Sequence, residues 1–249
     1  MPEPWILALL VGAAFAAGLV DAIAGGGGLL TVPALLAAGL PPQIALATNK
    51  GQAAFGAISS ATSFWMRGGI DKNRAPLGFI LGFVGSMTGA RVLLMIRPEP
   101  LKPVVLVLLM GAAAFLVWPR KPTKGEPHSW AMIALGPIAF VLGFYDGFFG
   151  PGVGSMLIVA FVVVFGDSLT RASGNAKVVN LASNVAALLL FVFKGTVLWR
   201  IALPMAVGNA FGAFVGAKIA IKQGDGLVRL MVVGVVTLLV LKMAYDLIR

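Results

Sequence analysis

Apolar runs follow one another along the chain with only short polar interruptions between them. In the first half they lie near residues 5–20, 29–40, 44–66, 76–96 and 101–118, and in the second half near residues 129–145, 153–166, 176–193, 201–221 and 227–247. A helix that spans a bilayer needs about 20 mostly apolar residues. The pattern therefore predicts an all-α, polytopic integral membrane protein with about eight transmembrane helices, or ten segments if the short runs are counted.

The first two runs of each half are short for a full crossing. Each pair fits two tilted spans, one span with a broken helix, or a re-entrant hairpin that returns to the side it entered from. The number of crossings is therefore left open at this point.

Composition agrees with a membrane protein, since 59% of the residues are apolar and 11% are charged, against about 25% charged in soluble domains. The net charge of +10 comes from Lys and Arg residues scattered singly between apolar runs. This scatter favours membrane orientation and gives no reason to expect nucleic acid as a partner. The chain has no cysteine, and its one histidine, His128, has no second histidine to share a metal. We expect no cofactor, no metal and no enzymatic activity.

The sequence contains an internal repeat, and three motifs recur in the same order. Gly18-Leu-Val-Asp21-Ala-Ile-Ala-Gly25-Gly26-Gly27 matches Gly143-Phe-Tyr-Asp146-Gly-Phe-Phe-Gly150-Pro-Gly152, Asn49-Lys50 matches Asn175-Ala-Lys177, and Gly85-x-x-x-Gly89-Ala-Arg91 matches Gly212-x-x-x-Gly216-Ala-Lys218. We therefore predict a first membrane-embedded repeat at residues 1–118, a polar linker at 119–128 and a second repeat at 129–249. Whether the two copies run parallel or inverted depends on the number of crossings in each.

The linker holds three basic residues, Arg120, Lys121 and Lys124, and the earlier loop with Arg67, Lys72 and Arg74 lies two segments before it. The alternate loop carries only Arg97 and Lys102. By the positive-inside rule, we expect the linker to face the cytoplasm.

Two glycine clusters, each preceded by an aspartate, are the first candidate site: Gly25 to Gly28 follow Asp21, and Gly150 to Gly154 follow Asp146. Glycines at this density break a helix, and broken backbone within a membrane must be buried in protein or line a wet cavity. The helix that restarts after each break would direct free amide groups toward an anion. The alternative is that the glycines only permit tight helix packing. The two aspartates would either couple transport to protons or cap the restarting helices.

Polar side chains within apolar runs form the second candidate site. They are Asn49, Lys50 and Gln52 in the first half, and Asn175, Lys177, Asn180 and Asn184 in the second. Lys177, Asn180 and Asn184 share one helical face, and their donors suit an oxyanion. The alternative is that each lysine extends to the membrane surface while the amides link helices. The Gly-x-x-x-Gly motifs that precede Arg91 and Lys218 are typical of close helix packing, and the basic residues would anchor the helix ends at the interface.

The motifs at Gly18–Pro33, Thr48–Gln52, Gly143–Gly152 and Asn175–Lys177 resemble those of the sulfite exporter TauE/SafE family, also called the toluene sulfonate uptake permease family. The resemblance covers nearly the whole chain and implies a multi-pass permease of the bacterial cytoplasmic (inner) membrane. It implies a sulfur-containing oxyanion as substrate, such as sulfite, a sulfonate or sulfoacetate, with export as the expected direction.

Our sequence-based hypothesis is a secondary transporter in a lipid bilayer with one anion site between the two halves. The substrate would be bound by Gly25, Gly26, Gly27, Asn49, Lys50, Gln52, Gly150, Gly152, Asn175, Lys177 and Asn180. Asp21 and Asp146 would couple protons or cap helices. The glycine-rich faces also allow a homodimer. An anion channel, or a membrane-embedded assembly factor without transport activity, are the alternative functions.

Overall fold

A computed structural model describes residues 3–97, 101, 103–105, 107–108, 110–111 and 130–223. Its main elements are helices, with no strand in these ranges, which confirms the all-α prediction. The helices are α1 (Pro4–Ala24), α2 (Gly28–Ala37), α3 (Pro42–Met66), α4 (Ala75–Met95), α6 (Ala131–Phe148), α7 (Val153–Phe165), α8 (Leu169–Phe193) and α9 (Trp199–Gln223). The predicted linker at 119–128, the segment at 227–247 and most of the segment at 101–118 lie outside the described residues.

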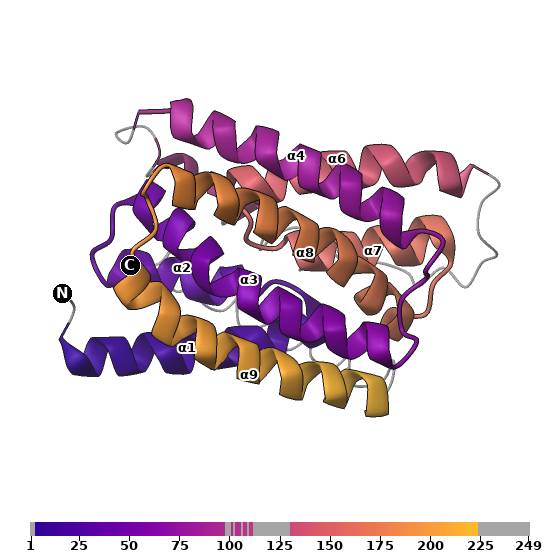
Figure 1. Cartoon of the computed structure of the whole chain (residues 1–249), viewed down its shortest axis with the longest axis horizontal. Coiled ribbons are helices and arrows are strands. Elements are labelled where there is room, and N and C mark those ends of the chain that lie inside the picture. Colours follow the sequence, from indigo (N-terminus) through magenta and orange to yellow (C-terminus); the bar gives the residue numbers. More distant parts are fainter. Residues whose placement is uncertain are drawn as a thin grey trace.

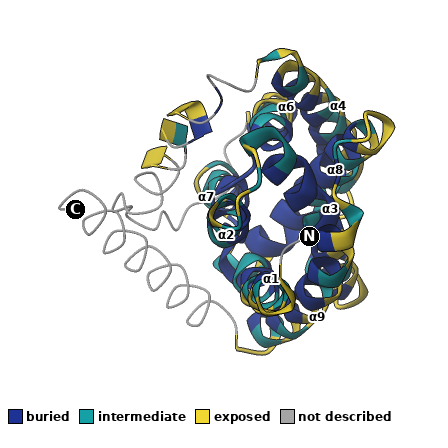
Figure 2. Ribbon diagram, turned by 90° about the vertical axis from the view of Figure 1, so that its left-hand side faces the viewer, coloured by how far each residue is buried: buried dark blue, intermediate teal, exposed yellow. Residues whose placement is uncertain are grey.

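Five of these helices, α1, α4, α6, α8 and α9, are long and apolar enough to cross a membrane. Large apolar side chains cover the outside of the bundle, and Met66, Ile133, Val207 and Phe193 are each more than 70% exposed. Buried residues lie toward the middle of the bundle and exposed ones around its rim (Figure 2). Since soluble proteins rarely expose so much contiguous apolar surface, this surface suits lipid. The chain is a polytopic membrane protein.

The observed helices extend several predicted segments. α8 begins at Leu169, not near 176, because Ser168 caps it and its Oγ accepts a hydrogen bond of 3.3 Å from the Arg171 amide. Its first turns are polar, so a hydropathy pattern misses them. α3 is also a full 25-residue helix, although its polar residues keep it out of the set of clearly apolar spans.

Each pair of short runs forms a helical hairpin. Leu35 near the end of α2 packs in one cluster with Leu10 near the start of α1, and Phe161 of α7 packs with Leu135 of α6 in the same way. Glycines with positive φ make both reversals, namely Gly25, Gly26, Gly150 and Gly152. The two members of each pair are therefore antiparallel neighbours, and the number of times each pair crosses the membrane stays a prediction.

Two helix pairs pack with their backbones in close contact. A Cβ atom on Gly89 of α4 would lie 2.0 Å from the Phe144 carbonyl oxygen of α6, and one on Gly212 of α9 would lie 2.0 Å from the Phe15 carbonyl oxygen of α1. The prediction that the Gly-x-x-x-Gly motifs serve packing is confirmed at both places. Arg91 and Lys218 are exposed, as expected of residues that follow the packed glycines.

α3 and α8 lie at the centre of the bundle and run in opposite directions (Figure 1). Near one end, the ring of Phe64 lies beside Gly174, and further along Lys50 contacts Asn184. Each hairpin directly precedes one of these two antiparallel helices, so the two hairpins enter the bundle from opposite ends. Their glycine breaks meet in the interior of the bundle.

Candidate functional site

The two helix breaks touch each other. A Cβ atom on Gly25 would lie 2.2 Å from the Ser155 amide nitrogen and 2.3 Å from the Gly154 carbonyl carbon. Ser155 Oγ also donates a hydrogen bond of 2.7 Å to the Ala24 carbonyl. Only glycine allows this approach, so the breaks in the two halves form a single structural feature.

Two ion pairs cross between the halves beside the breaks; one is fully buried, and the other is partly exposed at Asp21. Lys50 Nζ of α3 lies 2.6 Å from Asp146 Oδ1 of α6, and Lys177 Nζ of α8 lies 2.7 Å from Asp21 Oδ2 of α1. In each pair, the aspartate that precedes a break in one half meets a lysine from the central helix of the other half. Neither lysine reaches the membrane surface, since Lys50 is 2% exposed and Lys177 is 0% exposed. The interpretation in which they extend to the surface is wrong.

The Lys50–Asp146 pair is enclosed by polar side chains of α8. Asp146 Oδ2 accepts hydrogen bonds from Ser183 Oγ and, at 3.4 Å, from Asn184 Nδ2. Lys50 Nζ donates a second hydrogen bond of 3.3 Å to Asn184 Oδ1. These neutral partners add hydrogen bonds to both charged groups, as a buried pair requires.

The Lys177–Asp21 pair serves the backbone of the first break. Lys177 Nζ donates to the Asp21 carbonyl oxygen as well as to its carboxylate. Asp21 Oδ1 in turn accepts a hydrogen bond of 3.3 Å from the Gly27 amide, which precedes α2. Asp21 therefore contacts the backbone that leads into α2.

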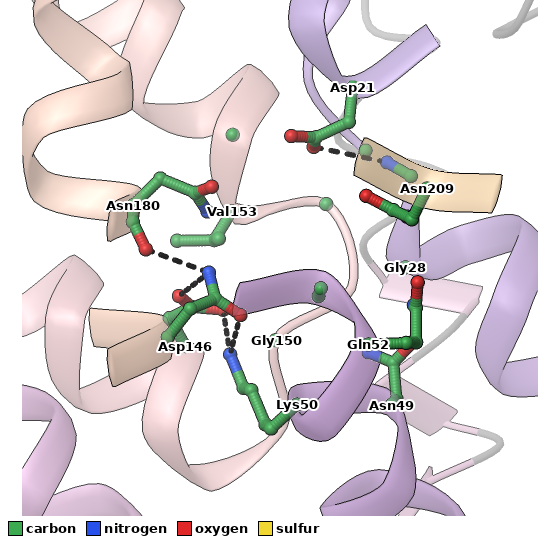
Figure 3. Close-up of a pocket in the computed structure, with 16 residues that line it drawn as sticks. Asp21, Gly28, Asn49, Lys50, Gln52, Asp146, Gly150, Val153, Asn180 and Asn209 are labelled. Atoms are coloured by element: carbon green, nitrogen blue, oxygen red, sulfur yellow. Dashed lines mark hydrogen bonds and ion pairs between the residues drawn. The ribbon is translucent and has the colours of Figure 1, made fainter. Parts of the chain in front are cut away.

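A small cavity of about 30 Å³, open to the exterior, lies where the breaks and α3 and α8 meet (Figure 3). It is lined by both glycine clusters and by polar side chains of five long helices, α1, α3, α6, α8 and α9. The predicted residues that line it are Gly26, Gly27, Asn49, Lys50, Gln52, Gly150, Gly152, Asn180, Asp21 and Asp146. Figure 3 shows Asp146 and Asn180 on one side of the cavity and Asn49, Gln52 and Asn209 on the other.

Three predicted residues lie outside the lining. Gly25 is packed against Gly154, and Lys177 is turned toward Asp21. Asn175 is held elsewhere, with Nδ2 2.7 Å from Asp167 Oδ2 and Oδ1 accepting a 2.7 Å hydrogen bond from the Asp71 amide. Asn175 is two residues from Lys177, whereas Asn49 is adjacent to Lys50, so the two asparagines face different directions on their helices.

The cavity also contains residues that the sequence-based site did not include. They are Gly28, Ala53, Val153, Gly154, Asn184 and Asn209. Gly28, Gly154 and Asn184 belonged to the two candidate clusters but not to the predicted set of substrate ligands. Asn209 is an asparagine within the apolar helix α9, and a polar residue inside such a helix is a usual signal of function. Comparison of the two halves does not point to Asn209, because the residue at the matching position of the first half, 127 positions earlier, is Gly82.

A second polar network joins the halves near one end of the bundle. Arg74, just before α4, binds Asp167 through both terminal nitrogens at 3.1 and 2.9 Å and binds Asp71 through Nε at 2.8 Å. Its guanidinium carbon lies 4.7 Å from the centroid of the Phe165 ring. Burial lowers the pKa of Arg74, but the two carboxylates outweigh this effect and raise it. Burial likewise raises the pKa of Asp71, but hydrogen bonds from Arg74 and Asn73 hold it below its ordinary value.

Comparison with known proteins gives the chain's relatives. The family model described as "Sulfite exporter TauE/SafE" matches residues 10–243. The "Probable membrane transporter protein YfcA" of Escherichia coli strain K12 is 39% identical over 252 residues, which cover 99% of this chain and 92% of the relative. A "Probable membrane transporter protein" of Haemophilus influenzae is 39% identical over 245 residues, covering 97% and 95%. The "Probable membrane transporter protein YunE" of Bacillus subtilis is 27% identical over 238 residues, covering 85% and 87%.

No solved structure matches the chain. The family model spans both halves, including the two glycine breaks and both lysine–aspartate pairs. The chain therefore belongs to the sulfite exporter TauE/SafE family.

Proposed function

We propose that this protein is a secondary transporter for a small sulfur-containing oxyanion, which binds in the cavity where the two helix breaks meet. The family's name supports export, and the names of the bacterial relatives support membrane transport. We place the protein in the bacterial cytoplasmic membrane as part of this proposal. The observation that carries the proposal is the Lys50–Asp146 ion pair, because it is buried, lines the cavity and joins the two halves.

The cavity offers the donors that an oxyanion needs. Lys50 supplies an ammonium group, and α2 and α7 both begin at the glycine clusters that line the cavity. Neither helix has an acidic residue in its first turn, although the Asp21 carboxylate contacts the Gly27 amide just before α2. The positive end of the α7 dipole is therefore the one that faces the cavity without such a contact to its N-cap amide. Anions bind well at such helix N-termini.

The charges around the cavity favour binding of the anion together with a proton. Lys50 is already neutralised by Asp146, and a second negative charge beside it would be costly in a buried site. Asp21 of α1 is paired with Lys177 in the same way, and Ser183 and Asn184 of α8 are neutral, so these groups offer no further positive charge for the anion. Protonation of Asp146 would free Lys50 for the substrate, so that each anion moves together with one proton.

The arrangement of the helices supports alternating access. α3 and α8 run in opposite directions, α4 packs on α6 as α9 packs on α1, and the two hairpins enter from opposite ends. We infer that the halves are inverted repeats, which can exchange conformations as they rock against each other. The ends of the bundle differ, since Arg74 and Asp167 join the halves by charge at one end and an apolar cluster with Phe149 and Phe191 lies toward the other.

The test is flux of radiolabelled sulfite in proteoliposomes. We would compare the native protein with the double variant Lys50→Gln, Asp146→Asn, which leaves no unpaired charge, and with Arg91→Gln on the exposed surface as a control. We expect saturable flux from the native and control proteins and a loss of about ten-fold or more in the double variant, equivalent to one good charge-assisted contact. Unchanged flux in a folded double variant would remove Lys50 as the anion's ligand.

The same vesicles distinguish a transporter from a channel. A pH gradient should drive sulfite to accumulate against its own concentration gradient if a proton moves with it. A channel gives only downhill flux. Downhill flux with no response to a pH gradient would favour the channel.

A further inference from the structure

One acceptor in the cavity has no partner within the protein. Gln52 is 1% exposed and lines the cavity. Among the buried side-chain nitrogen and oxygen atoms of the described residues, only Gln52 Oε1 lacks a hydrogen-bond partner. Native proteins rarely leave a buried polar atom unsatisfied, and such an atom at a binding site indicates a missing ligand group.

The orientation of the Gln52 amide follows from its neighbours. Gln52 Nε2 donates a hydrogen bond of 2.8 Å to Asn49 Oδ1, which also accepts one of 2.6 Å from Thr31 Oγ1. Thr31 Oγ1 also lies 3.3 Å from the Gly27 carbonyl oxygen, so its single proton is shared between two acceptors, and Gln52 Nε2 supplies the second donor to Asn49 Oδ1. Oε1 is therefore the end left for the cavity.

Unlike Gln52 Oε1, the charged groups of the cavity are either hydrogen-bond donors or acceptors that already have partners. Lys50 is a donor only, and the two aspartates already accept from Lys50, Lys177, Ser183 and the Gly27 amide. A ligand that satisfies the whole site needs oxygen acceptors for Lys50 and one hydrogen-bond donor for Gln52. A singly protonated oxyanion, such as hydrogen sulfite, has both.

We propose that Gln52 determines specificity by accepting a hydrogen bond from the substrate, and that the substrate class is small oxyanions that carry an O–H group. This inference rests on the proposed anion site. A sulfonate of the same charge has carbon in place of that hydroxyl and leaves Oε1 unsatisfied. A fully deprotonated dianion such as sulfate places a lone pair against Oε1. A site that binds a substrate hydroxyl discriminates strongly against analogues that lack it.

Ligand-induced thermal stabilisation of the purified native protein tests this without requiring transport. Titrations with sodium sulfite at mildly acid pH, where hydrogen sulfite predominates, would be compared with methanesulfonate and sulfate at the same pH. The chain has no cysteine, so sulfite cannot act by cleaving disulfides. We expect the apparent Kd for hydrogen sulfite to be lower than that for methanesulfonate by about ten-fold or more.

Two variants separate the role of Oε1 from a general disturbance of the site. Gln52→Met removes the acceptor at similar length and should abolish the preference for hydrogen sulfite over methanesulfonate. Thr31→Val removes the other donor to Asn49 but keeps Oε1, and it should retain the preference.

The outcomes also separate this inference from the proposed function. Equal Kd values for the two anions in the native protein, no stabilisation by sulfite, or a preference that survives in Gln52→Met would each overturn the inference. A preference that depends on Gln52 in a protein that gives no saturable flux would support the inference and overturn the transporter.

Discussion

Lys50 and Asp146 lie 96 residues apart in the sequence, yet they form a buried ion pair with Nζ 2.6 Å from Oδ1. The lysine comes from the central helix of one half and the aspartate from the hairpin of the other. The same exchange joins Lys177 to Asp21, but only the first pair lines the cavity with both of its members. The two pairs are therefore equivalent in the repeat and different in their surroundings.

We predict that Asp146→Asn separates anion binding from proton coupling. The amide cannot ionise, so Lys50 is free to bind an anion without an accompanying proton. Sulfite exchange across vesicles should persist, whereas accumulation driven by a pH gradient should fall by about ten-fold or more. Asp71→Asn, which changes a carboxylate far from the cavity lining, is the matched control. Normal pH-driven accumulation in Asp146→Asn would mean that another group carries the proton.

The thermal stability of Asp146→Asn should depend on whether substrate is bound. Removing one partner of a buried pair leaves an unpaired charge, which typically costs about 3–5 kcal/mol. Added sulfite would bind the free ammonium and restore part of this loss. We therefore expect sulfite to raise the melting temperature of Asp146→Asn by more than it raises that of the native protein. An equal rise in both proteins would argue against a contact between Lys50 and the anion.

Gly25→Ala should destabilise the protein severely. Gly25 has φ of +74°, and an added Cβ would meet the backbone of Ser155 and Gly154. Gly39→Ala is the control, because Gly39 has φ of +87° but nothing within 4 Å of the Cβ position. The control should lose only the roughly 1–2 kcal/mol that a left-handed backbone costs an L-residue. Melting temperatures in detergent measure the difference, and similar values would show that the breaks are not in tight contact.

Gly89→Ala should weaken the packing of α4 on α6, since the new methyl group would lie 2.0 Å from the Phe144 carbonyl oxygen. The helices would have to separate, at a typical cost of about 1–3 kcal/mol for overpacking. Gly12→Ala, with nothing within 4 Å of its Cβ position, should be neutral or slightly stabilising. Thermal unfolding of the two variants in the same detergent compares them, and an unchanged midpoint for Gly89→Ala would contradict the close approach.

Acid should weaken the network that joins the halves at Arg74. The pKa of Asp71 is held below its ordinary value of 3.8, so its contribution to stability is fully present above that value and is lost as the pH falls through the lowered pKa. Asp71→Asn removes this contribution at every pH. The melting temperatures of native and variant proteins should therefore differ at neutral pH and converge below about 3.8. A constant difference down to the most acid pH would show that the Asp71 charge is not what stabilises the loop.

Much of the architecture follows from local sequence. Runs of apolar residues give helices, and glycine clusters give breaks, because hydropathy and backbone freedom act within a few residues. The Gly-x-x-x-Gly motifs likewise gave close packing. The repeat directed attention to Asp21, Asp146, Lys50 and Lys177, since a pattern that occurs twice is visible without knowing the fold.

The sequence alone could not assign partners to these groups. Asn175 resembled a site residue by its motif but binds Asp167 and the Asp71 amide, while Asn209 had no counterpart in the first half and yet lines the cavity. Which lysine meets which aspartate, and whether the Gln52 side-chain oxygen finds a donor, depend on how helices far apart in the chain pack together. The sequence determined the kinds of groups that the membrane interior must accommodate. Only the antiparallel packing of α3 and α8 and the contact of the two breaks decided which of those groups face one another, because burial and charge pairing are properties of the assembled bundle.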